Sequence, residues 1–276
     1  MGVQNFIPTL WETKILKELD RQHMIVKNCT TKYSGTISGL GSKVKINSIN
    51  TPTIADYVPN VTNITPEQLK DESRMLEITR SKFFAFYLDD VDDKQTTGGI
   101  LTEGLRKAVI GLKDVAEQFV ATSYLEAGST VDENDLTSGN VLSTLMEART
   151  NLYENNVTEG MEVVLEVTPA VWQKMVLADI VYTDTGNTIR QGKFSPVLGM
   201  KVFMSNNLVV SGDEHNCIMR TKEAVGYAEQ IMKTEKYKPE NSFSEAVKGL
   251  HVYGMKVLKP KEIVRLQLEI GDETVI

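Results

Sequence analysis

The sequence predicts an α+β fold in which strands and helices are mixed without regular alternation. A long amphipathic helix is predicted over 102–127, where apolar residues recur every three or four positions. The chain ends in two strand-like stretches, 250–258 and 263–270, separated by Pro260. Because strands and helices do not alternate regularly, this order favours an α+β protein over a doubly wound parallel sheet.

The bulk composition is that of an ordinary globular protein. A net charge of -7 argues against general nucleic-acid binding, which needs clustered cations, and against docking on anionic membranes. Cys29 and Cys217 form no disulfide framework and no CxxC pair, so we expect a reducing compartment. We find neither a signal peptide nor an apolar run long enough to span a membrane.

The N-terminus predicts a short helix. Thr9 and Glu12 have the spacing of a capping box, and Trp11, Ile15 and Leu19 fall on one apolar stripe. A helix this short is marginal alone and needs a surface to lie on. Two interpretations stay open: the helix packs on its own core, or it is an arm that docks on a neighbouring copy.

The next predicted element is a strand within 35–49, in which Val44 and Ile46 alternate with lysines. The polar stretch 50–74 follows and is long for a connection without its own core. It contains Pro52, Tyr57, Pro59 and Pro66. We interpret it either as part of a long hairpin that stands away from the body or as a surface loop.

A strand is predicted over Leu76 to Leu88. Its last six residues are almost all apolar, so we expect this strand to be covered on both faces. Asp89 to Asp93 then places four carboxylates in five residues. Lys94 and Ile100 stand where a calcium-binding loop needs Gly and Glu, so a solvated turn is favoured over a metal site.

The helix over 102–127 would be about 39 Å long and should end at Gly128, acting as a C′ glycine. It is either a central core helix or the spine of a large flat subunit. The remaining predictions are a polar linker over 131–139, a helix over 141–153, a strand over 161–167, a helix over 170–177 opened by Pro169, a polar loop over 182–196, strands over 197–205 and 216–220, and a short helix near 222–226.

No catalytic constellation is found in the sequence. His23, His215 and His251 do not have metal-ligand spacing, and the GxSxG pattern is absent. The stretch from Gly39 to Lys43 lacks the spacing of a phosphate-binding loop and precedes a strand instead of a helix. We therefore assign no catalytic, cofactor-binding or metal-ligating residue and expect a protein that is not an enzyme.

Four stretches together resemble the major capsid (coat) proteins of tailed bacteriophages. They are Asn5-Phe-Ile-Pro-Thr-Leu-Trp11, Lys82-Phe-Phe-Ala-Phe-Tyr-Leu-Asp-Asp-Val-Asp92, Val197-Leu-Gly-Met-Lys-Val-Phe-Met-Ser-Asn-Asn207 and Gly249-Leu-His-Val-Tyr-Gly-Met-Lys-Val-Leu-Lys-Pro260. The resemblance runs from about Asn5 to Leu268 and implies the Hong-Kong-97 (HK97-like) fold. Its parts would be an N-terminal arm (1–32), an extended E-loop hairpin (33–81), a peripheral (P) domain (82–155 and 234–276, with the spine helix 102–127) and an axial (A) domain (156–233).

The resemblance implies a structural subunit that forms the pentamers and hexamers of an icosahedral phage head. The shell would enclose double-stranded DNA without sequence-specific binding, and the subunit would be assembled in the host bacterial cytoplasm and end in the virion. A portal is implied, and because the arm begins almost at Met1 we expect a separate scaffolding protein, or none. Neither a cofactor nor a membrane is implied. Candidate inter-subunit contacts in the arm and loop are Trp11, Ile15, Leu19, Pro52, Tyr57, Pro59 and Pro66.

Two alternatives remain open from the sequence. The first shares the fold: an encapsulin-like shell of a protein nanocompartment that encloses an enzyme. The second is of another class, a metal-dependent hydrolase that uses Asp89 to Asp93.

Overall fold

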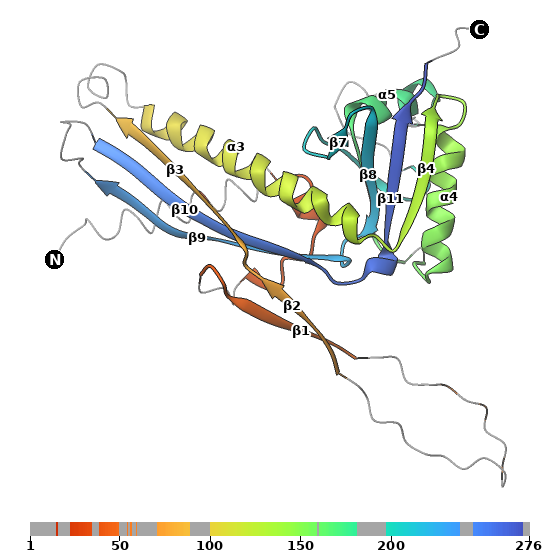
Figure 1. Ribbon diagram of the computed structural model, residues 1–276, viewed down its shortest axis with the longest axis horizontal. Helices are drawn as coiled ribbons and strands as arrows, with labels where there is room; N and C mark the ends of the chain where they lie inside the picture. The colour runs from red at the N-terminus through yellow and green to blue at the C-terminus, as the bar shows by residue number, and fades with distance from the viewer. Residues whose placement is uncertain are drawn as a thin grey trace.

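The computed structural model shows an elongated body, a compact body and a two-stranded ribbon that projects away from both (Figure 1). It describes residues 15, 23–34, 39–49, 54, 56, 59, 71–88, 100–158, 160–180, 197–237 and 245–272. Its elements are η2 (Val26–Asn28), β1 (Lys43–Ile49), β2 (Asp71–Glu77), β3 (Arg80–Leu88), α3 (Ile100–Ala121), η4 (Thr122–Glu126), β4 (Ser129–Leu136), α4 (Val141–Glu154), β5 (Val163–Val167), α5 (Pro169–Leu177), β6 (Lys201–Met204), β7 (Val210–Ser211), β8 (Glu214–Thr221), β9 (Val225–Tyr237), β10 (Glu245–Val257), η5 (Pro260–Glu262) and β11 (Ile263–Ile270).

The elongated body is a three-stranded antiparallel sheet, in the order β3-β10-β9, with the long helix α3 lying along it (Figure 1). The apolar stripe of α3 faces the sheet, and Val109 and Leu112 pack there against Phe84 and Ile231. Since one helix covers one face of a sheet, this arrangement explains why α3 is so long. The predicted spine helix is confirmed, although its regular part ends at Ala121.

The ribbon consists of β1 and β2, paired antiparallel from Lys43↔Glu77 to Ile49↔Asp71. The predicted hairpin is confirmed for its two strands. The predicted single strand over 76–88 is wrong, because β2 and β3 are separate strands that belong to different sheets. The chain crosses β10 at Gly254, where a Cβ atom would collide with the carbonyl oxygen of Glu77. Only glycine allows two backbones to approach this closely.

The compact body is a six-stranded sheet in the order β4-β11-β8-β5-β6, with β7 paired to β8. It is mixed, because β11 runs parallel to β4 and β5 parallel to β6, while β8 is antiparallel to both of its neighbours. Helices α4 and α5, both predicted from the sequence, pack on this sheet. Pro169 occupies the first turn of α5, as expected. None of the helices among the described residues is long and apolar enough to cross a membrane.

Three local predictions differ from the structure. The expected linker over 131–139 is largely strand β4, because Val131 and Leu136 are buried and the strand pairs with β11. Gly128 is not a helix cap. Its Cβ would lie 2.6 Å from the carbonyl oxygen of Pro260, so it is needed for a close approach to the turn before β11. The expected helix near 222–226 is a turn that leads into β9.

The two bodies also divide the chain differently from the expected domains. Strands β4 and β11 and helix α4, expected in the peripheral domain, lie in the compact body with the expected axial segment. Strand β9, expected mostly in the axial segment, pairs along β10 in the elongated body. The turn at Pro260 separates β10 from β11 and sends the two strands into different sheets.

Candidate assembly surfaces

Among the described residues, no helix or sheet covers one face of the elongated sheet. In β3, Phe84 and Phe86 point to the α3 side, whereas Phe83 and Tyr87 point away from it and are 78% and 69% exposed. The expectation that this strand is covered on both faces is therefore wrong for the single chain, because α3 covers only one of them. A continuous apolar run with one open face is typical of a surface that is buried by another molecule.

Neighbouring strands extend this apolar surface. Leu250 of β10 lies opposite Phe83, and Tyr237 of β9 shares a register partner with Tyr87, so all four side chains lie on the same side of the sheet. Leu250 and Tyr237 are also exposed. We call Phe83, Tyr87, Tyr237 and Leu250 the open sheet face. Next to them Lys248 pairs with Glu235 at 3.0 Å, so the charge of this lysine is compensated.

The ribbon presents a second surface. Its base is anchored, since Leu76 and Ile46 pack with Val252 of β10, and the Arg74 guanidinium donates to the carbonyl of Val257 at 3.1 Å. Along the ribbon, however, Met75 is exposed. A two-stranded ribbon is only marginally stable on its own in water, so a partner surface is physically favourable.

The predicted contacts in the loop lie mostly outside the described residues. Pro59 lies in a turn and is exposed, as is the nearby Ile54. Pro52, Tyr57 and Pro66 lie outside the part of the chain that the structure describes. Their role in contacts between subunits stays a prediction.

Ile15 is the described residue of the predicted arm helix. Its side chain is 3% exposed and packs within its own chain against Val109, Leu112 and Ile231. For this residue the structure agrees with the first interpretation, packing on the chain's own core, and leaves almost no surface for a neighbour. Trp11 and Leu19 lie outside the described residues.

A buried ion pair joins the N-terminal segment to the compact body. Arg220 of β8 has no exposed surface and binds Glu166 of β5 at 2.8 Å. The same guanidinium donates to the carbonyl oxygens of Asn28 at 2.8 Å and Ile25 at 3.2 Å. Asn28 in turn donates to Glu166 at 2.9 Å. These hydrogen bonds hold residues 25–28 in place where the two bodies meet. The sequence analysis did not identify this buried network.

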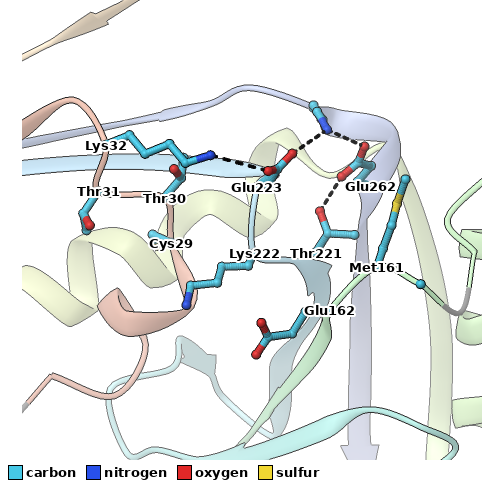
Figure 2. A pocket seen from close by; sticks show the side chains of 12 residues that line it. Cys29, Thr30, Thr31, Lys32, Met161, Glu162, Thr221, Lys222, Glu223 and Glu262 are labelled. Atoms are coloured by element: carbon cyan, nitrogen blue, oxygen red, sulfur yellow. Dashed lines mark hydrogen bonds and ion pairs between the residues drawn. The ribbon is translucent and has the colours of Figure 1, made fainter.

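A pocket of about 470 Å³ opens beside this joint (Figure 2). Its charged lining residues pair largely with one another: Glu223 contacts Lys32 at 3.7 Å and Lys259 at 3.2 Å, and Glu262 contacts Lys259 at 3.0 Å. Figure 2 also shows Thr221 directed at Glu262. Because Lys32, Lys259, Glu223 and Glu262 pair with one another, these four charges are not free to bind a substrate.

The described residues contain no group of three or more side chains able to hold a metal ion. Asp89 to Asp93, the basis of the hydrolase alternative, lie outside the described residues. Both cysteines are free and buried, and burial raises the pKa of Cys217 to about 12. A thiol with so high a pKa remains protonated at neutral pH and is a poor nucleophile.

The arrangement of these parts identifies the fold class of the protein. The elongated body, projecting ribbon and compact mixed sheet together form the HK97-like α+β fold of phage capsid proteins, so the expected fold class is confirmed. The chain superposes on a structure from Mycobacterium phage Che8 with a TM-score of 0.72 and 24% identity, over 89% of this chain and 91% of that chain. The capsid structure of cyanophage P-SCSP1u gives a TM-score of 0.71 and 16% identity, over 90% and 89% of the two chains.

A virus-like particle from Pyrococcus furiosus also shares the fold, with a TM-score of 0.58 and 13% identity, over 94% of this chain and 99% of that chain. No family model matches the sequence, and no curated protein sequence does. The shared fold is therefore found by comparing structures, whereas these two sequence comparisons give no match.

Proposed function

We propose that this chain is the major capsid protein of a tailed bacteriophage. Copies of it would assemble into pentamers and hexamers of an icosahedral shell that encloses double-stranded DNA in the virion. The proposal is supported by the shared fold over about 90% of the chain with phage capsid structures. The observation that carries it is the open sheet face, an apolar surface that the single chain leaves in water.

Burial of this face supplies a driving force for assembly. Fully burying one large apolar side chain contributes about 1.5–3 kcal/mol, and Phe83 and Tyr87 are each mostly exposed. Aromatic side chains in well-packed pockets dominate the energetics of many interfaces. We propose that the open sheet face, the ribbon and the arm residues Trp11 and Leu19 contact sibling copies, and that heterologous contacts of this kind close into rings.

The acidic net charge of -7 fits a container that encloses DNA without holding it tightly. The partners that we propose beyond sibling copies are a separate scaffolding protein and a portal, with assembly in the host bacterial cytoplasm. A strong, salt-sensitive affinity of the purified subunit for duplex DNA would contradict the proposed neutral or acidic inner wall.

The test is assembly of the expressed chain, alone and with a candidate scaffold, followed by electron microscopy and sedimentation. The wild-type chain should give regular closed particles. Phe83→Ser combined with Tyr87→Ser should leave a folded chain that sediments as small species. Lys82→Ser is the matched control, because Lys82 is an exposed neighbour on the same strand whose side chain belongs to the α3 side. Particles from the double variant as regular as those of the wild type would argue against this surface.

The compartment alternative shares the fold and is distinguished by its contents. The likeness to the virus-like particle from Pyrococcus furiosus does not favour it, because both phage structures described above superpose with higher TM-scores. Purified particles that enclose a cargo enzyme and lack DNA would favour this alternative.

A further inference from the structure

Two buried histidines share one carboxylate where the N-terminal segment crosses the elongated body. The Nε2 atom of His23 lies 3.4 Å from Oε1 of Glu229, and Nε2 of His251 lies 3.0 Å from Oε2 of the same residue. Tyr227 donates its hydroxyl hydrogen to that Oε2 at 2.9 Å. His23 is 2% exposed and His251 is fully buried, so water does not compete for these contacts.

A second buried carboxylate faces the other side of His23. Glu117 of α3 accepts from the backbone N–H groups of Met24 and, at 3.1 Å, Ile25, and its Oε1 lies 3.9 Å from Nδ1 of His23. Thus each ring nitrogen of His23 faces a carboxylate. Within the described part of the chain, neither Nδ1 nor Nε2 of His23 forms a hydrogen bond of normal geometry.

This arrangement fits a charged imidazole better than a neutral one. A neutral imidazole has one N–H and can donate to only one of the two carboxylates, whereas an imidazolium donates from both nitrogens. Charge-assisted hydrogen bonds are roughly twice as strong as neutral ones. Protonation of His23 would therefore tie Glu117 of α3 and Glu229 of β9 to the N-terminal segment at once.

The charges around His23, His251, Glu117 and Glu229 are compatible with an additional proton on His23. Lys113 of α3 lies 3.8 Å from Glu117, so with neutral histidines the two carboxylates share this one ion pair among the described residues. From the turn after β6, Asn207 donates to Glu117 at 2.9 Å and is neutral. Among the described residues, Tyr227 packs its ring against His23, Tyr253 packs against His251 on β10, and the exposed Lys82 lies opposite His251 on β3. Asp114 of α3 contacts Lys113 at 3.7 Å and so also bears on the charge of this lysine.

Glu229 is an ionised acceptor beside the two imidazoles. Burial alone would raise the pKa of Glu229, but the close contacts and the charge of His23 and His251 outweigh it and hold the pKa well below its usual range. A carboxyl whose pKa is depressed by folding contributes stability above its ordinary pKa of about 4.3, and loses that contribution only in stronger acid. With the imidazoles protonated, the acceptor is therefore charged.

We propose that His23 is a pH-sensitive latch, which fastens the N-terminal segment to the elongated body when protonated and loosens it as the pH rises. The proposal rests on the geometry of the cluster and stands apart from the capsid function. If both hold, the latch sets how readily the arm leaves its own subunit.

The test is hydrogen exchange of the amides of Met24 and Ile25 in the full chain, corrected for the intrinsic pH dependence of exchange. In the wild-type chain, protection should fall about tenfold across about pH 5–8, the range in which imidazoles generally exchange their proton. Tenfold is the change expected for one charge-assisted hydrogen bond. His23→Gln should show low protection that does not vary with pH. His23→Lys, with a fixed charge, should remove the pH dependence while retaining protection.

His215→Gln is the matched control, because His215 bonds Thr168 in the compact body and should leave the wild-type profile unchanged. If His23→Gln does not fold, judged by near-ultraviolet circular dichroism, Glu229→Gln removes the same contact from the other side and should also flatten the profile. Protection in the wild type that is equal at both pH values, or a wild-type slope retained in a folded His23→Gln or Glu229→Gln, would overturn the proposal.

Discussion

Arg220 carries a full charge with no access to water. It pairs with Glu166 and also satisfies the backbone carbonyls of Ile25 and Asn28, so the N-terminal segment and the compact body depend on the same guanidinium. Buried pairs add little net stability compared with apolar residues, but removal of one partner leaves the other charge buried and uncompensated. The role of Arg220 is thus to fix one arrangement of the chain at the joint.

Arg220→Met should lower the free energy of unfolding by about 3–5 kcal/mol, because it strands Glu166 and two carbonyls. The combination with Glu166→Leu should cost less than the sum of the two single variants, since it removes both buried charges. Urea unfolding measures these changes. Lys201→Met is the control: it breaks the exposed pair with Glu162 and should change stability by less than about 1 kcal/mol. If Arg220→Met lowered stability no more than Lys201→Met does, this account of the joint would be contradicted.

At the scale of elements, local sequence patterns predict those helices and strands whose periodicity comes from a single buried face. Helix α3 and strand β11 follow their apolar spacing closely. Strand β4 was missed because its exposed positions are acidic and only Val131 and Leu136 show the buried side. The break between β2 and β3 has no signal in their own residues, since its cause is Gly254 in a distant strand.

Gly254→Ala should destabilise the protein by about 1–3 kcal/mol, because its methyl group meets the backbone at Glu77 and cannot be relieved by a side-chain rotation. Gly111→Ala is the matched substitution with the opposite sign. No atom lies within 4 Å of its added Cβ, and alanine in a helix interior is favoured over glycine by about 0.5–1 kcal/mol. Thermal unfolding of the two variants should therefore move in opposite directions from the wild type. A neutral Gly254→Ala would show that the crossing tolerates a side chain.

At the scale of the whole molecule, the candidate site is the open sheet face, an apolar surface that remains exposed in the single chain. The run from Phe83 to Leu88 predicts a strand buried on both faces, and this failed for the isolated chain because one cover is missing. Sequence alone does not say whether such a cover comes from the same chain or from another. The order of strands in the two sheets was also beyond reach, because it depends on long-range pairings such as β11 with β8.

Oxidation of methionines reports whether the ribbon is covered in a shell. In the unassembled chain, peroxide should oxidise the exposed Met75 rapidly and leave the buried Met219 intact. In assembled particles Met75 should become protected by at least about threefold, if the ribbon lies against a sibling copy. Mass spectrometry of both states gives the two rates. Unchanged oxidation of Met75 in closed particles would show that this part of the ribbon stays in solvent.

The ribbon and the edge of the elongated sheet are made from one uninterrupted stretch of backbone, with only Ile78 and Thr79 between β2 and β3. Any pull that a sibling exerts on the ribbon must therefore run along covalent bonds into β3, and from there through the hydrogen bonds to β10. At Gly254 the backbone of β10 packs directly against the backbone at Glu77, with no side chain between them that could move aside. If a sibling copy contacts the ribbon, strain in that copy would pass through the ribbon into the elongated sheet of this chain and to helix α3, which lies on the sheet.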